Sequence, residues 1–183
     1  MGKLAYGMMM SLDGFVADPS AHFDQEVLRF INDETRKNGT EIYGRRMYEE
    51  MVFWETYDEQ GGSGPADEFA RIWKGFDKLV VSTTLERASS ARTRVVPEFR
   101  PDEIRKLKAE SDKDISVAGP TLAAQFIKAG LVDEYGLYIV PVVIGAGNPV
   151  FRNIDGLELE LVEERRFPLG IVFMRYVPRN TGR

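Results

Sequence analysis

The stretch Glu41-Ile42-Tyr43-Gly44-Arg45-Arg46-Met47-Tyr48-Glu49 decides how the rest of the sequence is interpreted. The apolar pair Ile42-Tyr43 is typical of the end of a buried strand, and Gly44, which follows it, permits a tight turn. Met47, Met51 and Trp54 then recur at the spacing of one helix face. The stretch therefore predicts a strand that passes directly into a helix, with two arginines at the junction.

These two arginines, Arg45 and Arg46, indicate an anion site. The first turn of a helix carries unpaired N–H groups and the positive end of the helix dipole, so it favours anions over cations. A bound phosphate would neutralise both side chains, and the planar guanidinium group suits phosphate oxygens. In the alternative interpretation the arginines are solvated or pair with Glu41, Glu49 or Glu50, and the sequence leaves both open.

Length and composition narrow the class of protein. A chain of 183 residues is expected to form one domain over residues 1–183. It has no cysteine and one histidine, His22, which we place in a loop. The lack of cysteine and the single histidine argue against thiol catalysis, a serine–histidine relay and any metal site. The net charge of −5 without a basic run argues against nucleic acid as a partner. Without a membrane-length apolar run or a signal-peptide pattern, we expect no membrane contact and a cytoplasmic location.

Strand and helix patterns alternate along the chain. Residues 3–10 are apolar without interruption after the first position, which is typical of a strand buried on both faces of a parallel sheet. Further strands are expected at 40–43, 76–82, 92–96, 114–118 and 133–144. Helices are expected over 24–37, after Arg45, from Pro65, from Pro101 and from Leu122 to Gly130. A flexible loop is expected at 58–64.

The C-terminal region has the pattern of an antiparallel hairpin. Residues 157–161 alternate Leu with Glu, as in a half-exposed strand, and 171–177 return as its partner. Pro141 implies a bulge or an unpaired N–H midway along the preceding strand. Together the patterns predict a three-layer α/β/α sandwich with a mostly parallel central sheet and a C-terminal antiparallel hairpin.

Three further turns follow predicted strands, at the sheet edge where open α/β proteins place their ligands. Asp13 lies in the first of them, in Ser11-Leu12-Asp13-Gly14. Ser82-Thr83-Thr84 offers three hydroxyls, although an ordinary turn is the favoured interpretation. Gly119-Pro120-Thr121-Leu122 offers backbone N–H groups to an anion, or is a tight connection and nothing more.

Taken together, these turns resemble those of the dihydrofolate reductase-like family, and the resemblance spans nearly the whole chain. It is strongest for the branch that contains the reductase half of the bifunctional riboflavin-biosynthesis deaminase–reductase. The motifs that carry it are Ser11-Leu12-Asp13-Gly14, Gly44-Arg45-Arg46 with Tyr48-Glu49 before Trp54, Val80-Val81-Ser82-Thr83-Thr84-Leu85, Val117-Ala118-Gly119, Gly130-Leu131-Val132-Asp133-Glu134 and Pro141-Val142-Val143-Ile144-Gly145-Ala146-Gly147.

The resemblance implies the family's fold and an NADPH site, with the two arginines favouring the 2′-phosphate of NADP. The chain departs from the family pattern at Met47, where a threonine is usual, at Pro120, where a second glycine is usual, and in lacking the deaminase half. By position, Gly44, Arg45, Arg46, Ser82 and Thr83 would hold the adenosine phosphate end, Gly119, Pro120, Thr121 and Leu122 the pyrophosphate, and Val16 and Ala17 would border the nicotinamide.

The first hypothesis is an NADPH-dependent reductase that transfers a hydride to a C=N or C=O of a small pterin-like or riboflavin-precursor-like heterocycle. Asp13 is the candidate for orienting substrate or water, with a structural Asp-Gly turn as the alternative. Trp54 and Tyr138 would line the substrate slot, or belong to the core.

A second hypothesis, supported by Met47, is a non-catalytic module that binds a nucleotide, flavin or drug-like ligand. A third is an assembly role, with a homodimer formed through residues 157–161 and the final hairpin.

Overall fold

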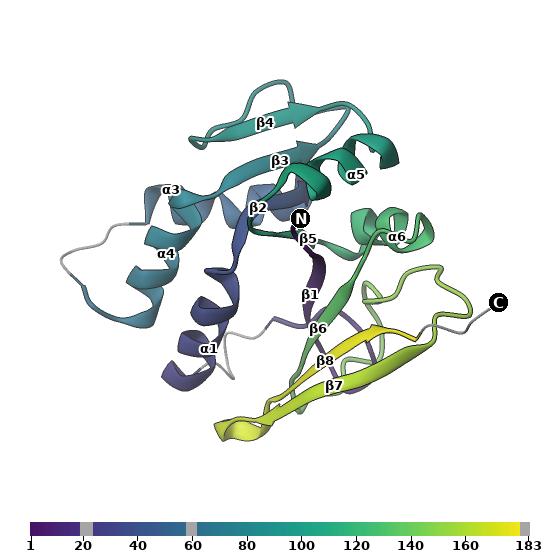
Figure 1. Cartoon of the computed structure of the whole chain (residues 1–183). Coiled ribbons are helices and arrows are strands. Elements are labelled where there is room, and N and C mark those ends of the chain that lie inside the picture. The colour runs from purple at the N-terminus through teal and green to yellow at the C-terminus, as the bar shows by residue number, and fades with distance from the viewer. Residues whose placement is uncertain (19–23, 58–61, 180–183) are drawn as a thin grey trace.

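A computed structural model describes residues 1–18, 24–57 and 62–179. His22 lies outside these ranges, as does most of the loop expected at 58–64. The described chain forms one eight-stranded sheet with the strand order β4-β3-β2-β5-β1-β6-β8-β7 (Figure 1). The strands are β1 (Leu4–Met10), β2 (Asn38–Gly44), β3 (Asp77–Val81), β4 (Thr93–Val96), β5 (Asp114–Ala118), β6 (Glu134–Ile139), β7 (Leu159–Arg166) and β8 (Val172–Pro178).

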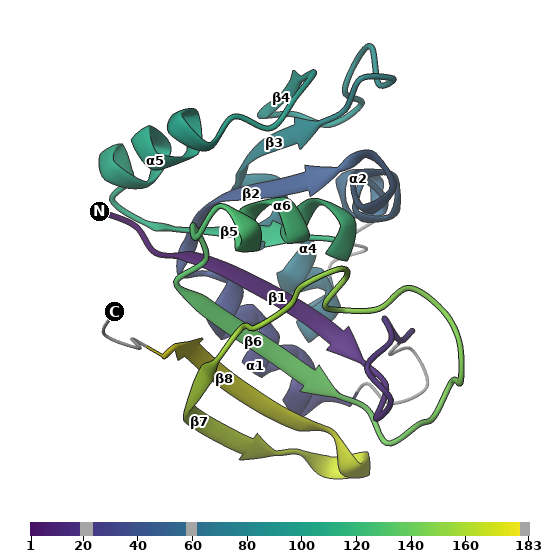
Figure 2. The ribbon, with the colours of Figure 1, turned by 90° about the vertical axis from the view of Figure 1, so that its right-hand side faces the viewer.

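Helices cover both faces of this sheet, as predicted for a three-layer sandwich. In Figure 2, α5 and α6 lie in front of the sheet and α1 and α4 behind it. None of the helices in the described ranges is both long and apolar enough to cross a membrane. The helices are α1 (Gln25–Thr35), α2 (Arg45–Met51), α3 (Phe53–Thr56), α4 (Pro65–Gly75), α5 (Pro101–Glu110) and α6 (Pro120–Lys128), with a 3-10 turn at Pro168–Gly170.

The sheet is parallel from β4 to β6, and β8 pairs antiparallel with both β6 and β7. The predicted mostly parallel sheet with a C-terminal hairpin is therefore confirmed. Two boundaries differ. The strand expected at 133–144 ends at Ile139, because Val140 makes the last N–H bond to β1 and Pro141 has no N–H to continue the ladder. The hairpin strand expected at 157–161 lies instead over β7.

The central strands present two different faces. On β1, Leu4 and Tyr6 are fully buried towards α5 and α6, whereas Gly7 on the other face is exposed. The expectation that residues 3–10 are buried alike on both faces is therefore wrong. Large residues alternate with small ones along each central strand: Leu4, Ala5, Tyr6 and Gly7 on β1, Ile115, Ser116, Val117 and Ala118 on β5, and Tyr135, Gly136 and Leu137 on β6.

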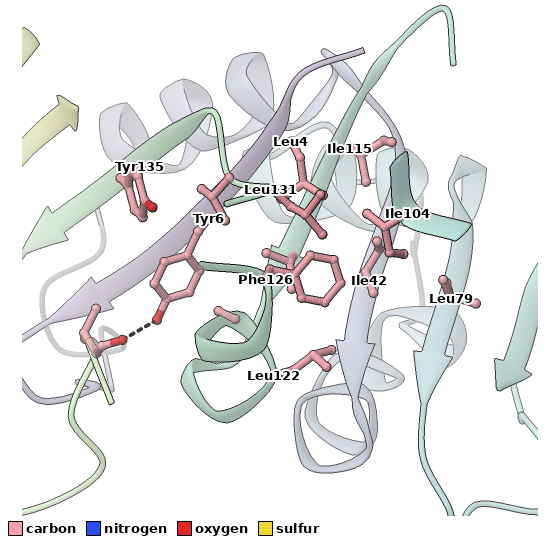
Figure 3. Packing of buried hydrophobic residues seen from close by; sticks show 14 of the residues in the cluster. Leu4, Tyr6, Ile42, Leu79, Ile104, Ile115, Leu122, Phe126, Leu131 and Tyr135 are labelled. Carbon is pink, nitrogen blue, oxygen red and sulfur yellow. Dashed lines mark hydrogen bonds between the residues drawn. The ribbon is translucent and has the colours of Figure 1, made fainter. Parts of the chain in front are cut away.

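The large residues form the main hydrophobic core with α5 and α6. Figure 3 shows Ile42, Ile115 and Phe126 packed together there, all fully buried. Tyr6 belongs to the same cluster, and its hydroxyl donates to the carbonyl of Val150 at 2.8 Å. Full burial of one such side chain contributes about 1.5–3 kcal/mol. This face therefore carries the main core, and the α1 side of the sheet carries a smaller buried cluster that includes Val27, Phe30 and Phe173.

Candidate functional site

The opposite face of the sheet carries a cleft of about 1590 Å³, lined by residues of α1, α2, α4 and the central strands. Its floor is made of the small residues that alternate with the core residues. Leu28 and Ile31 of α1 line it from the helical layer. The cleft thus follows from the sequence pattern, because side chains that could fill it are missing from the middle of the sheet. The floor residues are Ala5, Gly7, Ser116, Ala118 and Gly136.

Most of the predicted site residues line this cleft together. The turns after β2 and β5 meet at its carboxyl end because these strands are neighbours, with Tyr43 paired to Ala118. Gly119 has φ +93°, a conformation that favours glycine, and a Cβ there would lie 3.4 Å from the Cβ of Met47. The predicted residues in the lining are Val16, Ala17, Gly44, Arg45, Arg46, Trp54, Gly119, Pro120, Thr121, Leu122 and Tyr138.

The two arginines of the first turn of α2 have different surroundings. Arg45 pairs with Glu49 at 2.7 Å and donates to the hydroxyl of Thr84 at 2.9 Å, so the ion-pair alternative holds for this residue. Arg46 is exposed at the cleft and has no hydrogen-bond or ion-pair partner within residues 1–18, 24–57 and 62–179. Arg46 is therefore available to an anion, and Arg45 is already oriented by the protein.

The hydroxyl cluster after β3 forms a turn of its own. Ser82 Oγ accepts the backbone N–H groups of Thr84 at 3.2 Å and Leu85 at 3.0 Å. Neither Ser82 nor Thr83 is in the lining of the cleft, which fits the turn interpretation. Thr84, the third hydroxyl of the cluster, is the member that contacts Arg45.

Asp13 lies in the turn after the end of β1, where the sequence placed it. It is outside the cleft lining, and its carboxylate accepts the N–H groups of Gly145 at 2.7 Å and Ile144 at 3.2 Å. Hydrogen bonds from the Ser11 hydroxyl and from the Gly145 N–H lower the pKa of Asp13 to about 2. This geometry is that of a structural turn residue that ties the loop after β6 to the end of β1, and it gives no support to a catalytic role.

The remaining predicted residues border the cleft. Val16 donates its N–H to the carbonyl of Asn148 at 2.8 Å, which fixes the loop after β1 against the loop after β6. Trp54 packs edge-to-face on Phe69 with ring centroids 4.8 Å apart. Tyr138 both lines the cleft and stacks on Phe173 at 4.8 Å, so the substrate-slot and core interpretations both apply to it.

A buried carboxyl group deep in the cleft was missed by sequence reasoning. Glu41 is 6% exposed and accepts hydrogen bonds from the Ser116 hydroxyl, from Asn38 Nδ2 at 2.9 Å and from the Tyr43 hydroxyl. Burial raises the pKa of Glu41, and these hydrogen bonds oppose that rise. The available signal was a glutamate next to the apolar pair Ile42-Tyr43 at the end of a buried strand.

A second polar group in the lining joins α1 to the sheet. Arg175 of β8 pairs with Glu34 of α1 at 2.7 Å, with Glu163 of β7 at 2.7 Å, and with Glu134 of β6. Across the described parts of the chain, no group of three or more His, Cys, Asp or Glu side chains is arranged to hold a metal ion. The deep polar groups of the cleft are therefore ion-paired or hydrogen-bonded side chains.

Comparison with known proteins identifies the family. Residues 3–173 match the family model described as the RibD C-terminal domain. The chain belongs to this family. The uncharacterized protein YyaP of Bacillus subtilis (strain 168) is 28% identical over 182 residues, which cover 95% of this chain and 94% of that protein.

Solved structures share the fold of this RibD C-terminal domain. A putative riboflavin biosynthesis protein from Shewanella sp. PV-4 superposes with a TM-score of 0.72 and 16% identity, over 97% of this chain and 99% of that one. Dihydrofolate reductase from Enterococcus faecalis, solved in complex with NADP(H), has a TM-score of 0.67 and 15% identity over 98% of both chains. The predicted dihydrofolate reductase-like fold is thus confirmed.

The carboxyl end of the cleft in this RibD-family chain fits the diphosphate and phosphate groups of NADPH. It presents two kinds of donor to an anion: the guanidinium groups of Arg45 and Arg46, and backbone N–H groups at the start of α6. The absence of a side chain on Gly119 leaves those N–H groups accessible. No peptide bond within the described residues is cis, so the Gly119–Pro120 bond is trans.

Proposed function

We propose that this protein is a cytoplasmic NADPH-dependent oxidoreductase that reduces a C=N or C=O bond of a small pterin-like or riboflavin-precursor-like heterocycle. When bound, NADPH supplies the hydride from C4 of its nicotinamide. One observation carries the proposal. The arginine turn and the Gly119 turn line one end of a single cleft, and the middle of that cleft has a flat floor of small residues.

The chain's own residues would divide the cleft between cofactor and substrate. Arg46 would bind the 2′-phosphate, with Arg45 held beside it by Glu49 and Thr84. Val16 is fixed by its bond to Asn148 and would border the nicotinamide ring. The N–H groups of Gly119, Thr121 and Leu122 would bind the pyrophosphate, with Pro120 shaping the turn between them, and Trp54 and Tyr138 would flank the substrate.

The test is calorimetric titration with NADPH and NADH of the unmodified protein, Arg46→Ala and Arg105→Ala. A hydrogen bond to a charged group contributes about 1.5–3 kcal/mol, so we expect Arg46→Ala to weaken NADPH binding about 10- to 100-fold and to leave NADH unchanged. Arg105 is the matched control, because it pairs with Asp102 on α5, outside the cleft lining. No binding of NADPH to the unmodified protein at millimolar concentration would refute the proposed cofactor.

Met47 favours a second candidate, a non-catalytic module that holds a nucleotide or flavin. Its Cβ lies 3.4 Å from where a Cβ of Gly119 would stand, so an apolar side chain lies beside the proposed pyrophosphate site. The discriminating measurement is turnover. NADPH binding without NADPH oxidation across a panel of pterins, flavin precursors and small carbonyl compounds would favour this candidate over the reductase.

We also propose that two copies pair through the outer edge of β7. An edge strand offers unpaired backbone groups, and Leu161 and Val162 on β7 are 44% and 50% exposed. In an antiparallel pair around a two-fold axis between Glu164 and Arg165, Glu164 of one copy would lie opposite Arg165 of the other. Light scattering should give the mass of a dimer, and Arg165→Glu should return the mass of a monomer.

A further inference from the structure

The loop of residues 82–92, here called the β3–β4 loop, lies beside the arginine turn. It begins with the hydroxyl cluster, and its Thr84 accepts the hydrogen bond from Arg45 at 2.9 Å. Strands β3 and β4 are parallel, and parallel neighbours are usually joined by a helix. The β3–β4 loop contains neither helix nor strand, so contacts with other parts of the chain hold it in place.

Tyr48 of α2 anchors this loop through its hydroxyl group. The residue is 1% exposed, and its oxygen accepts the backbone N–H groups of Ser89 at 2.9 Å and Ser90 at 3.0 Å. Burial raises the pKa of Tyr48, but the hydrogen bonds from Ser89 and Ser90 outweigh burial and lower it. The Tyr48 oxygen is thus surrounded by donors that come from the loop.

The hydrogen of the Tyr48 hydroxyl is also directed to the loop. Thr93 donates its hydroxyl hydrogen to the carbonyl of Ala91 at 2.9 Å, so Ser90 Oγ, 2.7 Å from Thr93 Oγ1, donates to Thr93. Because the Ser90 hydrogen is used in this way, Ser90 Oγ accepts from Tyr48 at 2.9 Å. Tyr48 therefore accepts two hydrogen bonds and donates one, and all three partners belong to the β3–β4 loop.

The middle of the β3–β4 loop rests on the same side chain. Leu85 and Ala88 pack against the small buried cluster that contains Tyr48. On α2, Tyr48 follows Arg45 by three residues, and positions i and i+3 are neighbours on a helix surface. Tyr48 therefore supports the loop next to the place where Thr84 meets Arg45.

Two other side chains hold the end of the loop that is next to β4. Glu55 Oε1 accepts the N–H of Ala91 at 3.0 Å, and Lys78 Nζ donates to the carbonyl of Ala91 at 3.4 Å. These contacts do not involve Tyr48 and would persist without its hydroxyl. Loss of that hydroxyl should therefore release the part of the loop near Thr84 while its other end stays attached.

We propose that Tyr48 is a positioning residue for the 2′-phosphate of NADPH and acts through the β3–β4 loop. Tyr48 lies outside the cleft lining. By fixing the loop it keeps Thr84 in contact with Arg45, so this guanidinium is oriented before the phosphate arrives. A donor that is oriented in advance loses less conformational entropy on binding than a mobile one. The inference rests on the proposed function, because it takes the arginine turn as the site of this phosphate.

The test is a double-mutant cycle in which calorimetry measures NADP⁺ binding to the full chain. Tyr48→Phe keeps the ring, and we expect it to weaken binding about five- to tenfold, the effect of one hydrogen bond. In the Arg45→Ala background the same change should weaken binding less than about twofold, because the side chain that Tyr48 positions is missing. Tyr6→Phe is the matched control and should bind NADP⁺ as the unmodified protein does, because it removes a buried hydroxyl, bonded to Val150, on the other face of the sheet.

Hydrogen exchange on the same proteins checks the structural part of the inference. In Tyr48→Phe the amides of Ser89 and Ser90 lose their acceptor, so they should exchange faster than in the unmodified protein. Tyr6→Phe should leave the exchange of these two amides unchanged. Unchanged exchange in Tyr48→Phe would show that the loop is held by other contacts and would overturn the inference.

The outcomes separate this inference from the proposed function. If folded Tyr48→Phe binds NADP⁺ as tightly as the unmodified protein, the inference fails and the proposed cofactor stands. An equal loss with and without Arg45 also overturns the inference, because it indicates a general structural effect. If Tyr48→Phe does not fold, Ser90→Ala replaces it, since it breaks the hydroxyl chain, and a loss of about twofold or more is expected with Arg45 present. No NADP⁺ binding by the unmodified protein would refute the proposed cofactor and this inference together.

Discussion

The two faces of the same sheet differ in what their side chains do. Towards α5 and α6, β1 contributes Leu4 and Tyr6, which are fully buried in a continuous core. Towards α1, the same strand contributes Ala5 and Gly7, which line an open cleft. Both faces are made by a single alternating pattern with period two. A strand can therefore supply stability with one set of residues and empty space with the residues between them.

The two faces also differ in how they bind their helices. Helix α6 packs on the sheet through fully buried Phe126, whose ring lies 4.5 Å from that of Phe99. Helix α1 contacts the sheet through Phe30, which packs edge-to-face on Phe173 with ring centroids 4.9 Å apart, and through the ion pair of Glu34 with Arg175. The contacts on the cleft side are thus partly polar, whereas those on the core side are apolar. Substitutions on the two sides should therefore change the free energy of unfolding by different amounts.

The largest effect is expected for Phe126→Ala on the core face. Removing this fully buried ring should lower the free energy of unfolding by about 3–5 kcal/mol, because the core cannot collapse onto the cavity. The matched change on the cleft side is Leu28→Ala, for which we expect about 1 kcal/mol or less, since Leu28 borders open space. Urea unfolding of both variants measures the difference, and equal losses would show that the two faces are energetically alike.

A smaller effect should separate the two glycines of the cleft floor. A Cβ on Gly136 would lie 3.3 Å from Phe173 Cε2, so Gly136→Ala should destabilise the fold by about 1–2 kcal/mol through overpacking. Gly7→Ala meets nothing closer than 3.8 Å and should change stability by about 0.5 kcal/mol or less. Thermal unfolding checks both values. If Gly7→Ala were the more harmful of the two, the floor would be more tightly packed than these contacts indicate.

The smallest effect is expected at Asp13, outside both faces. Its pKa of about 2 in the folded protein is below the ordinary value of 3.8, so its ionised form stabilises the fold above about pH 4. That contribution should disappear as the pH falls from about 4 towards 2. Asp13→Asn should therefore be less stable than the unmodified protein at pH 7 and nearly equal to it at pH 2. A stability difference that stays constant over this range would contradict the hydrogen bonds to the loop at 144–145.

Sequence reasoning succeeded where the signal is local. The turn Gly44-Arg45-Arg46 was predicted from adjacent residues, and the structure places a strand end and a helix start there. Boundaries were less predictable. Pro141 was expected to give a bulge or an unpaired N–H midway along a strand, but it follows the end of that strand, because Val140 makes the last N–H bond to β1 and Pro141 has no N–H.

Residues whose partners are far away in sequence could not be assigned from local patterns. The sequence left Asp13 open between a catalytic and a structural role, and its bonds from the N–H groups of Ile144 and Gly145, more than a hundred residues further on, favour the structural one. Glu41 and Ser116 are 75 positions apart, and no local pattern connects them. Hydrogen-bond partners across a parallel sheet depend on strand order, which the sequence does not state.

The sequence by itself determined the order of helices and strands, the arginine turn and the alternation of large and small residues. These features depend on the propensities and side-chain periods of neighbouring residues. Only the tertiary structure decided that the small residues of β1, β5 and β6 share one floor, and that Glu41, Ser116 and Arg175 meet around it. The physical reason is that a cleft is formed by surfaces from several strands and a helix, and their relative placement is set by packing over the whole chain.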